Sequence, residues 1–375
     1  MKTRFLLFIL LIITTLILQV FSGCAQNLQH QQTSMLKFKK MVYTDREGTG
    51  LEAFSFLMPA DWQFDGRIWW LLDQPAMPAN SSIRVFNPAG NEEFEILPNS
   101  CFFWTTNLQT LGMFPPGSKY FGSTVKKPVS ATKALSDLVL PWARGNCSGL
   151  KVISNDEFPE LIEVLGIGKN NSAFMSDKAE AAKIRVTWQK NEIPMEEEIW
   201  GVAEQITFPV KGMLGVTYNT IWYIHYLVSF KSEKGKLDEN SKIFQTITSS
   251  FKINPRWQAK YENMIEYLAQ QQIQQIRSVG ELSRMLSQMS DQMRNEQLEQ
   301  FEQRSSVYDK VAQMHSDNIL GIDRYFDPYE GREVELPSGY NHVWCNNLGE
   351  YVLTDNPNYN PNVGDNLSWQ PLEKK

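Results

Sequence analysis

Hydrophobic and polar residues alternate along several stretches between residues 36 and 256, and this period of two indicates β-strands with one apolar face. Residues 37–44 and 51–58 predict two strands joined by a turn that contains glycine. The alternation is clearest at residues 184–189 and 222–230, where alternate positions are apolar. These four stretches therefore predict strands of a sheet that buries one face.

Two helices are predicted between and after these strands. Residues 130–140 begin with Ser130, which can cap a helix, and are followed by Pro141, which should end it. Residues 240–249 predict the second helix. Hairpin-like strands with inserted helices favour an α+β fold over residues 36–256, in which an antiparallel sheet is covered by helices, over a parallel doubly wound sheet.

Residues 257–320 have a different pattern, because their apolar residues recur at spacings of three and four. This pattern predicts a long amphipathic helix with a narrow apolar seam, typical of a coiled coil, or a helix pair divided at Gly280. We expect the seam to contact an unknown protein partner, a second copy of the chain, or the preceding domain. Its densest part consists of Leu282, Leu286, Met289 and Met293.

Residues 321–375 predict a small β-rich, turn-rich tail. Short extended runs at residues 332–336, 341–346 and 350–355 predict a three-stranded meander. Side-chain oxygens at residues 355–365 could suit calcium, but their spacing is not that of an EF-hand loop. Asparagine is common in turns for backbone reasons, so turns are the favoured interpretation.

The N-terminus has the pattern of an export signal. Lys2 and Arg4 precede an apolar run at residues 5–18, which is shorter than the roughly 20 apolar residues of a spanning helix. We therefore interpret residues 1–23 as a signal peptide, with an uncleaved membrane anchor as the alternative.

The end of this segment, Ser22-Gly23-Cys24, resembles the bacterial lipobox, although Phe21 stands where leucine is usual. The resemblance implies that Cys24 is acylated and becomes the mature N-terminus of an exported, membrane-anchored lipoprotein. Ala25 follows the cysteine instead of Asp, which implies the outer membrane if the source is Gram-negative. Residues 24–35 would then form the lipidated cysteine and a polar tether.

Two motifs resemble those of PsbP-like domains, named for an extrinsic subunit of the oxygen-evolving photosystem. Residues 56–62 (FLMPADW) are similar to the opening strand and turn, and residues 243–251 (IFQTITSSF) are similar to the last helix and strand. The resemblance implies a single antiparallel sheet sandwiched by helices and a non-enzymatic accessory or assembly role. Residues 338–344 and 349–353 also resemble the tail of a group of functionally uncharacterised bacterial proteins, which implies no activity.

Composition and charge narrow the classes of partner. The chain has 375 residues and a net charge of -6, with 36 Lys+Arg against 42 Asp+Glu, which argues against nucleic acid as a partner. Four cysteines and four histidines provide few ligands for a metal that prefers sulfur or nitrogen, so we predict no metal and no cofactor. Cys101 and Cys147 are a candidate disulfide, and separate buried thiols, including Cys345, are the alternative.

The usual catalytic motifs are missing from the sequence. There is no H-E-x-x-H, C-x-x-C or G-x-S-x-G, and residues 166–169 lack the spacing of a phosphate-binding loop. Glu196 and Glu198 could share one face of a strand, but a solvated strand edge around residues 196–198 is favoured. His225 lies in an apolar strand, where a structural histidine is favoured over a catalytic base.

The sequence therefore predicts a non-enzymatic envelope lipoprotein with a binding or scaffolding role at the membrane surface. The alternative is an enzyme or binding module that acts on cell-wall or glycan ligands through the tryptophan-rich domain, for example through Trp69 and Trp70. A pocket with converging carboxylates would favour the alternative. A closed, aromatic-filled core would favour scaffolding.

Overall fold

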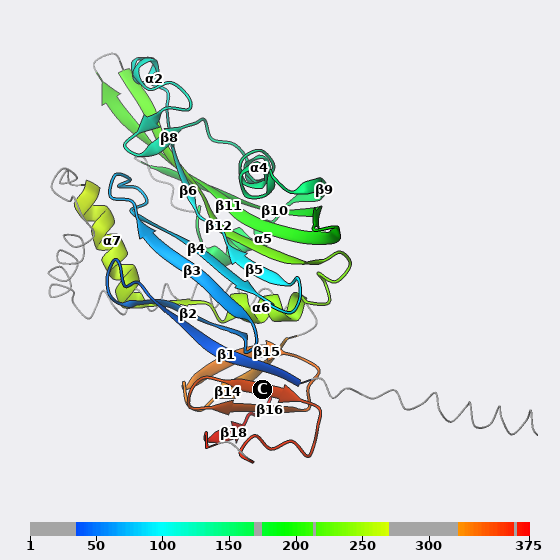
Figure 1. Cartoon of the computed structure of the whole chain (residues 1–375). Helices are drawn as coiled ribbons and strands as arrows, with labels where there is room; N and C mark the ends of the chain where they lie inside the picture. The colour runs from blue at the N-terminus through cyan, green and yellow to red at the C-terminus, as the bar shows by residue number, and fades with distance from the viewer. Residues whose placement is uncertain (1–34, 169–174, 213–214, 270–321, 364–365) are drawn as a thin grey trace, which may run out of the picture.

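The computed structural model describes residues 35–168, 175–212, 215–269, 322–363 and 366–375. Most of the regular structure in these residues is β-strand, arranged in three sheets (Figure 1). The large sheet lies at one end of the molecule, and the sheet that contains the C-terminal strands lies at the other.

The large sheet is antiparallel along its main path. Its strand order is β3 (Gln63–Trp70), β4 (Ala79–Phe86), β5 (Glu93–Ile96), β12 (Gly215–Glu233), β11 (Ile193–Gly212), β10 (Ser176–Lys190) and β9 (Ser148–Glu157). Three further strands extend it beside β12, namely β6 (Ser100–Thr105), β7 (Lys119–Tyr120) and β8 (Ser123–Val125).

The second sheet joins both ends of the described chain. Its order is β13 (Lys252–Ile253), β2 (Glu52–Pro59), β1 (Met35–Thr44), β17 (Tyr351–Thr354), β16 (His342–Asn346) and β18 (Trp369–Pro371). Strand β1 thus pairs with β2 on one side and with β17 on the other. A separate hairpin of β14 (Ile322–Asp327) and β15 (Arg332–Pro337) lies beside it.

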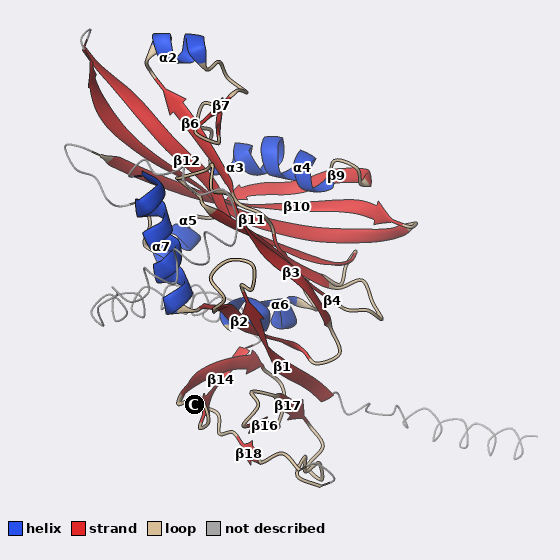
Figure 2. Cartoon of the chain, turned by 60° about the vertical axis from the view of Figure 1, so that its left-hand side comes forward, coloured by secondary structure: helices blue, strands red, loops and turns tan. Residues whose placement is uncertain are grey.

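The helices are short, and all except α2 lie against the sheets (Figure 2). They are α2 (Leu108–Met113), α3 (Ala131–Ala134), the π-helix η1 (Leu135–Val139), α4 (Leu140–Arg144), α5 (Pro159–Leu165), α6 (Ser241–Ser249) and α7 (Pro255–Ala269). Helices α3, η1 and α4 cover one face of the large sheet, whereas α6 packs against β2 and β15.

The predicted cap at Ser130 is confirmed, because its hydroxyl accepts a hydrogen bond from the Lys133 amide. The prediction that Pro141 ends this helix is wrong, because helical structure continues to Arg144. Proline cannot donate the hydrogen bond of a regular helix interior, and the π-turn of η1 immediately before it locally changes the bonding pattern.

The core is filled largely by aromatic side chains. Phe54 stacks on Tyr43 and on Phe251, and Trp62 meets Phe244 edge to face. These rings belong to one buried cluster formed by β1 to β5, the end of β12, α6 and the start of α7. A second cluster, centred on Trp222, Ile184 and Ile199, lies between the large sheet and α3 to α4.

The predicted α+β sandwich, one antiparallel sheet covered by helices, is therefore wrong. The described chain is mainly β and has several sheets. One cause is the pairing of β1 with β17, which joins the start of the predicted domain to the tail in a second sheet. This pairing is distant in the sequence, so local patterns do not predict it.

The prediction of a long helical segment at residues 257–320 also needs correction. Its described part belongs to the 15-residue helix α7 (Pro255–Ala269), which packs partly against β2. The remainder, with Leu282, Leu286, Met289 and Met293, lies outside the described residues.

The three extended runs of the tail are confirmed as β15, β16 and β17, but the meander is wrong. Strand β15 pairs with β14, whereas β16 and β17 pair with each other and β17 continues into β1. The partner of β17 lies about 300 residues earlier in the chain, and local patterns carry no information on such a pairing.

Candidate functional site

Among the described residues, a buried network of charged side chains surrounds Glu197 of β11. Its carboxylate is fully buried and binds Arg144 of α4, with Arg144 Nε 2.8 Å from Glu197 Oε2 and Nη2 2.7 Å from Oε1. Ser229 Oγ donates to Oε1 at 2.5 Å, and Trp188 Nε1 donates to Oε2 at 3.0 Å. Four donor atoms from α4, β10 and β12 therefore hold this carboxylate in place.

The network continues to β5. Arg144 also binds Glu95, and Lys231 of β12 lies 2.8 Å from Glu95 and 2.5 Å from Glu93. Burial raises the pKa of Glu93, but its contacts with Arg84 and Lys231 outweigh burial and lower that pKa to about 2. Burial lowers the pKa of Arg144, but the carboxylates of Glu197 and Glu95 outweigh burial and raise that pKa above its usual value.

These charges balance, since Arg84, Arg144 and Lys231 face Glu93, Glu95 and Glu197. Hydrogen bonds between charged partners are strong and hold both side chains in a fixed geometry. The network is thus suited to fixing α4 on the sheet.

The predicted solvated edge at residues 196–198 is wrong, because β11 is an interior strand between β10 and β12. Glu196 binds Arg185, and Glu198 accepts a hydrogen bond from Trp200 Nε1. One signal in the sequence could have located Glu197. It occupies the same strand face as the buried residues Met195 and Ile199, so it interrupts an apolar stripe.

A second group contains His225 and Glu204 on the opposite face of the large sheet. His225 Nε2 lies 3.3 Å from Glu204 Oε2, although not in hydrogen-bonding geometry. The register of β11 and β12 shifts between Trp200 and Val202, and Tyr226 has a positive φ of 52°. A bulge and a left-handed non-glycine residue are costly features that cluster at functional positions.

Burial shifts both groups toward their neutral forms. It lowers the pKa of His225 to about 4. Burial, and secondarily the charge of Asp177, raises the pKa of Glu204 to about 7. Below neutral pH a protonated Glu204 could donate a hydrogen bond to Nε2 of a neutral His225 after a small rotation of either side chain.

Glu204→Gln is expected to reduce the pH dependence of stability. The folded state keeps the Glu204 proton up to about pH 7, and the unfolded state loses it near pH 4.5. The stabilisation from this proton is therefore complete below pH 4.5 and is lost as pH rises through 7. Above pH 7 the neutral variant should be more stable than the parent, by on the order of 2 kcal/mol.

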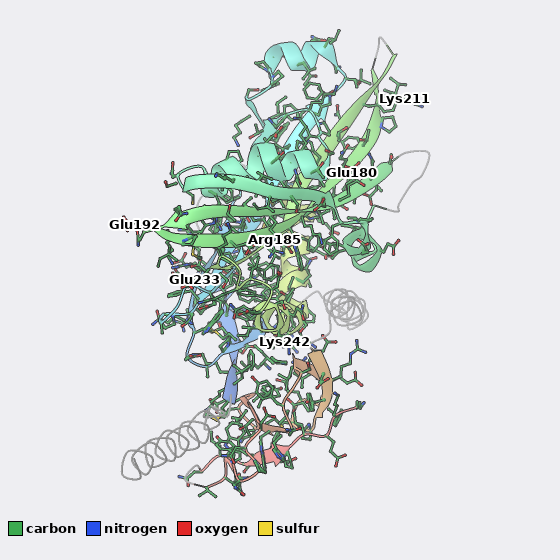
Figure 3. The ribbon with its side chains drawn as sticks, turned by 90° about the vertical axis from the view of Figure 1, so that its right-hand side faces the viewer. Glu180, Arg185, Glu192, Lys211, Glu233 and Lys242 are labelled. Carbon is green, nitrogen blue, oxygen red and sulfur yellow. The ribbon has the colours of Figure 1, made fainter. Side chains whose placement is uncertain are left out.

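Urea unfolding at several pH values between 5 and 8 measures this effect. Glu192→Gln, on the exposed β10–β11 turn labelled in Figure 3, is the matched control and should leave the pH profile unchanged. Parallel pH profiles for Glu204→Gln and the parent would contradict the assignment.

Trp70, considered for glycan stacking, is half-buried and hydrogen-bonded within the protein. Its indole Nε1 donates to Asp45 Oδ2 at 3.2 Å, and Trp257 Nε1 of α7 donates to the same oxygen at 2.9 Å. Trp257 also stacks on Tyr261. Trp69 lies under the guanidinium of Arg67. Asp45 and these indoles therefore connect the β1–β2 turn to β3 and α7.

The remaining predicted site residues lie apart from these groups. Cys101, Cys147 and Cys345 are free thiols, so the candidate disulfide is not formed in this structure. Burial raises the pKa of Cys101 to about 11, and its Sγ lies 3.3 Å from Ser123 Oγ. Cys24 lies outside the described residues.

The asparagines of the tail stabilise turns in the described residues. Asn356 Oδ1 accepts from the Asn358 amide, and Asn360 Oδ1 accepts from the Asn362 amide. Within the described ranges, no group of three or more His, Cys, Asp or Glu side chains is arranged to hold a metal ion.

Comparisons with known proteins add no assignment. No protein-family model matches the sequence, and no curated protein matches it. Among the helices of the described ranges, none is long and apolar enough to cross a bilayer.

Proposed function

We propose that this protein is a non-enzymatic envelope lipoprotein that binds or scaffolds at a membrane surface. The observation that carries the proposal is the closed charge network, in which Glu93, Glu95 and Glu197 are each bound by arginine or lysine. Carboxylates held in this way are occupied by contacts within the protein, which favours a structural role for the network.

The filled aromatic core supports the same proposal over a glycan-active enzyme. Tyr43, Phe54, Phe56 and Phe251 stack on one another, and Trp70 packs against Trp257 and Tyr261. Rings that contact each other in this way contribute to packing of the protein itself.

The start of the folded body suits attachment to a membrane. Met35 begins β1 and is exposed, so a tether from Cys24 would enter the fold at this strand. Strand β1 is hydrogen-bonded to β2 and β17, and Lys39 Nζ donates to the Ala60 carbonyl at 2.7 Å. A pull on the tether would therefore act on an interior strand rather than on a loose edge.

Cys24→Ala is expected to abolish fatty-acid incorporation, because the acylated sulfur would be missing. The variant should accumulate as an unprocessed precursor, which electrophoresis after metabolic labelling with a fatty acid would detect. Cys147→Ala removes a free thiol elsewhere and should be labelled like the parent. Equal labelling of Cys24→Ala and the parent would disprove the lipid anchor.

A further inference from the structure

Exposed apolar side chains gather at one end of the large sheet. We call this surface the apolar tip, and Figures 1 and 2 both show its elements, α2 and the ends of β11 and β12, close together at the top of the molecule. Leu108 is 83% exposed and Phe121 is 67% exposed, which is unusual for side chains of this size. The tip consists of Leu108, Met113, Phe121, Val210, Val216 and Tyr218.

The two parts of the tip are fixed to each other by backbone contacts. Strand β6 pairs with β12 up to Thr105 and Asn219. Beyond this pair the Thr106 amide donates to the Tyr218 carbonyl at 2.9 Å, and the Tyr218 amide donates to Thr106 Oγ1 at 2.8 Å. The exposed side chains are thus presented by a continuous hydrogen-bonded framework.

Helix α2 receives little stabilisation from packing against the rest of the protein. It has six residues, it is capped by Asn107 Oδ1, and none of its residues is buried. Short helices are marginal unless an apolar face is packed, yet Leu108 and Met113 point their apolar side chains to solvent. These exposed apolar side chains are typical of a helix that packs against a surface outside this chain.

Phe121 is a further exposed apolar residue of the tip. Phe121 and Gly122 form the two-residue turn between β7 and β8, where positive φ values, here 46° and 76°, are usual. Tyr120 meets Phe121 edge to face and stacks on Phe103. The turn therefore holds an aromatic ring at the surface of the tip, where a partner outside the chain could contact it.

The charge around the tip is positive in an otherwise acidic protein. Residues 97–136 and 205–232 contain lysines and no Asp or Glu, whereas the whole chain has a net charge of -6. Lys119 and Lys211 are exposed, and Figure 3 places Lys211 near the end of the β11–β12 hairpin. Asp73 adjoins the tip from the loop before β4, with its backbone against Gly122, and still leaves an excess of positive charge.

We propose that the apolar tip binds the surface of a bilayer that contains anionic lipid. Leu108, Met113 and Phe121 would enter the headgroup region, where apolar side chains leave water. Lys119 and Lys211 would approach the lipid phosphates, which attract cations near an anionic surface. This inference does not depend on acylation of Cys24, because the tip belongs to the folded body.

Binding to vesicles tests the proposal without the lipid anchor. Residues 24–375 with Cys24→Ala retain every described residue and are mixed with vesicles of phosphatidylcholine, with or without phosphatidylglycerol. Sedimentation should show binding to the anionic vesicles only, and raised salt should weaken it because the lysines are exposed. Lys119→Glu with Lys211→Glu should lower this binding by about tenfold or more.

Two further variants separate the contributions. Leu108→Ser, Met113→Ser and Phe121→Asn together remove the apolar side chains and should also lower binding, while asparagine tolerates the left-handed backbone at residue 121. Lys190→Glu with Lys234→Glu makes the same charge change at the opposite end of the large sheet and should bind like the parent. Unchanged thermal unfolding would show that the exposed substitutions leave the fold intact.

Several outcomes would overturn the proposal. Equal binding to both kinds of vesicle, or no binding to either, would exclude anionic lipid as the occupant. An equal loss of vesicle binding in Lys190→Glu with Lys234→Glu would show that binding depends only on the net charge of the protein. A self-associating parent whose oligomer is lost in the tip variants, without lipid binding, would identify a second copy of the chain as the occupant.

Discussion

Glu197→Ala is expected to lower the free energy of unfolding by about 3–5 kcal/mol, because it removes one partner of a buried charge pair. Arg144 would keep its charge in a buried position with Glu95 as its remaining carboxylate. Trp188 Nε1 and Ser229 Oγ would also lose their acceptor. Equilibrium unfolding in urea measures the loss, which is a large fraction of the stability of an ordinary domain.

Glu198→Ala is the matched control, since it removes a neighbouring carboxylate on the same strand. Glu198 accepts one hydrogen bond, from Trp200 Nε1, among the contacts described here, so we expect a loss of about 1 kcal/mol. Arg144→Met with Glu197→Met should cost less than the sum of the two single changes, because neither charge is then left alone. A loss below about 1 kcal/mol for Glu197→Ala would show that the network contributes little.

Local patterns in the sequence were sufficient for elements whose partners are close in the chain. The strands at residues 37–44 and 51–58 are the hairpin of β1 and β2, and the helix at residues 240–249 is α6. In the tail, β16 and β17 are a hairpin of adjacent strands. Period-two alternation and turn residues act within a few residues of each other, which explains this success.

Long-range pairing was the part that local patterns could not supply. The apolar stripe of β11 does not reveal that β10 and β12 lie on either side of it, so Glu196, Glu197 and Glu198 were placed on an edge. Of the three, Glu197 is fully buried, where Arg144 of α4, Trp188 of β10 and Ser229 of β12 bind it. The sequence also did not predict that Phe121 is exposed, because an aromatic residue is more often part of the core.

Phe38→Ala is expected to destabilise the link between the two ends of the chain by about 3–5 kcal/mol. Phe38 is fully buried in a cluster that it and Leu57 share with residues of the tail. Its own strand, β1, has β17 as a neighbour, with Phe38 opposite Tyr351. Removing the ring would therefore leave a cavity between segments that only tertiary contacts hold together.

The same cluster leads to a stronger test, in which the chain is divided between residues 269 and 322. Residues 24–269 alone would expose Phe38 and Leu57 and leave β1 without β17, a loss of about 3–6 kcal/mol from the two side chains alone. We expect this fragment to bind a hydrophobic dye and to unfold without a sharp transition.

Co-expression with residues 322–375 should restore a cooperative transition, because the tail supplies the missing strand and the other half of the cluster. The two fragments should then co-purify. Phe38→Asp in the first fragment should prevent this association, since a charge would enter the shared core, whereas Val42→Asp at an exposed position of β1 should not. Cooperative unfolding of residues 24–269 alone would show that the sheet tolerates the loss of β17 and that the tail is an accessory to a complete domain.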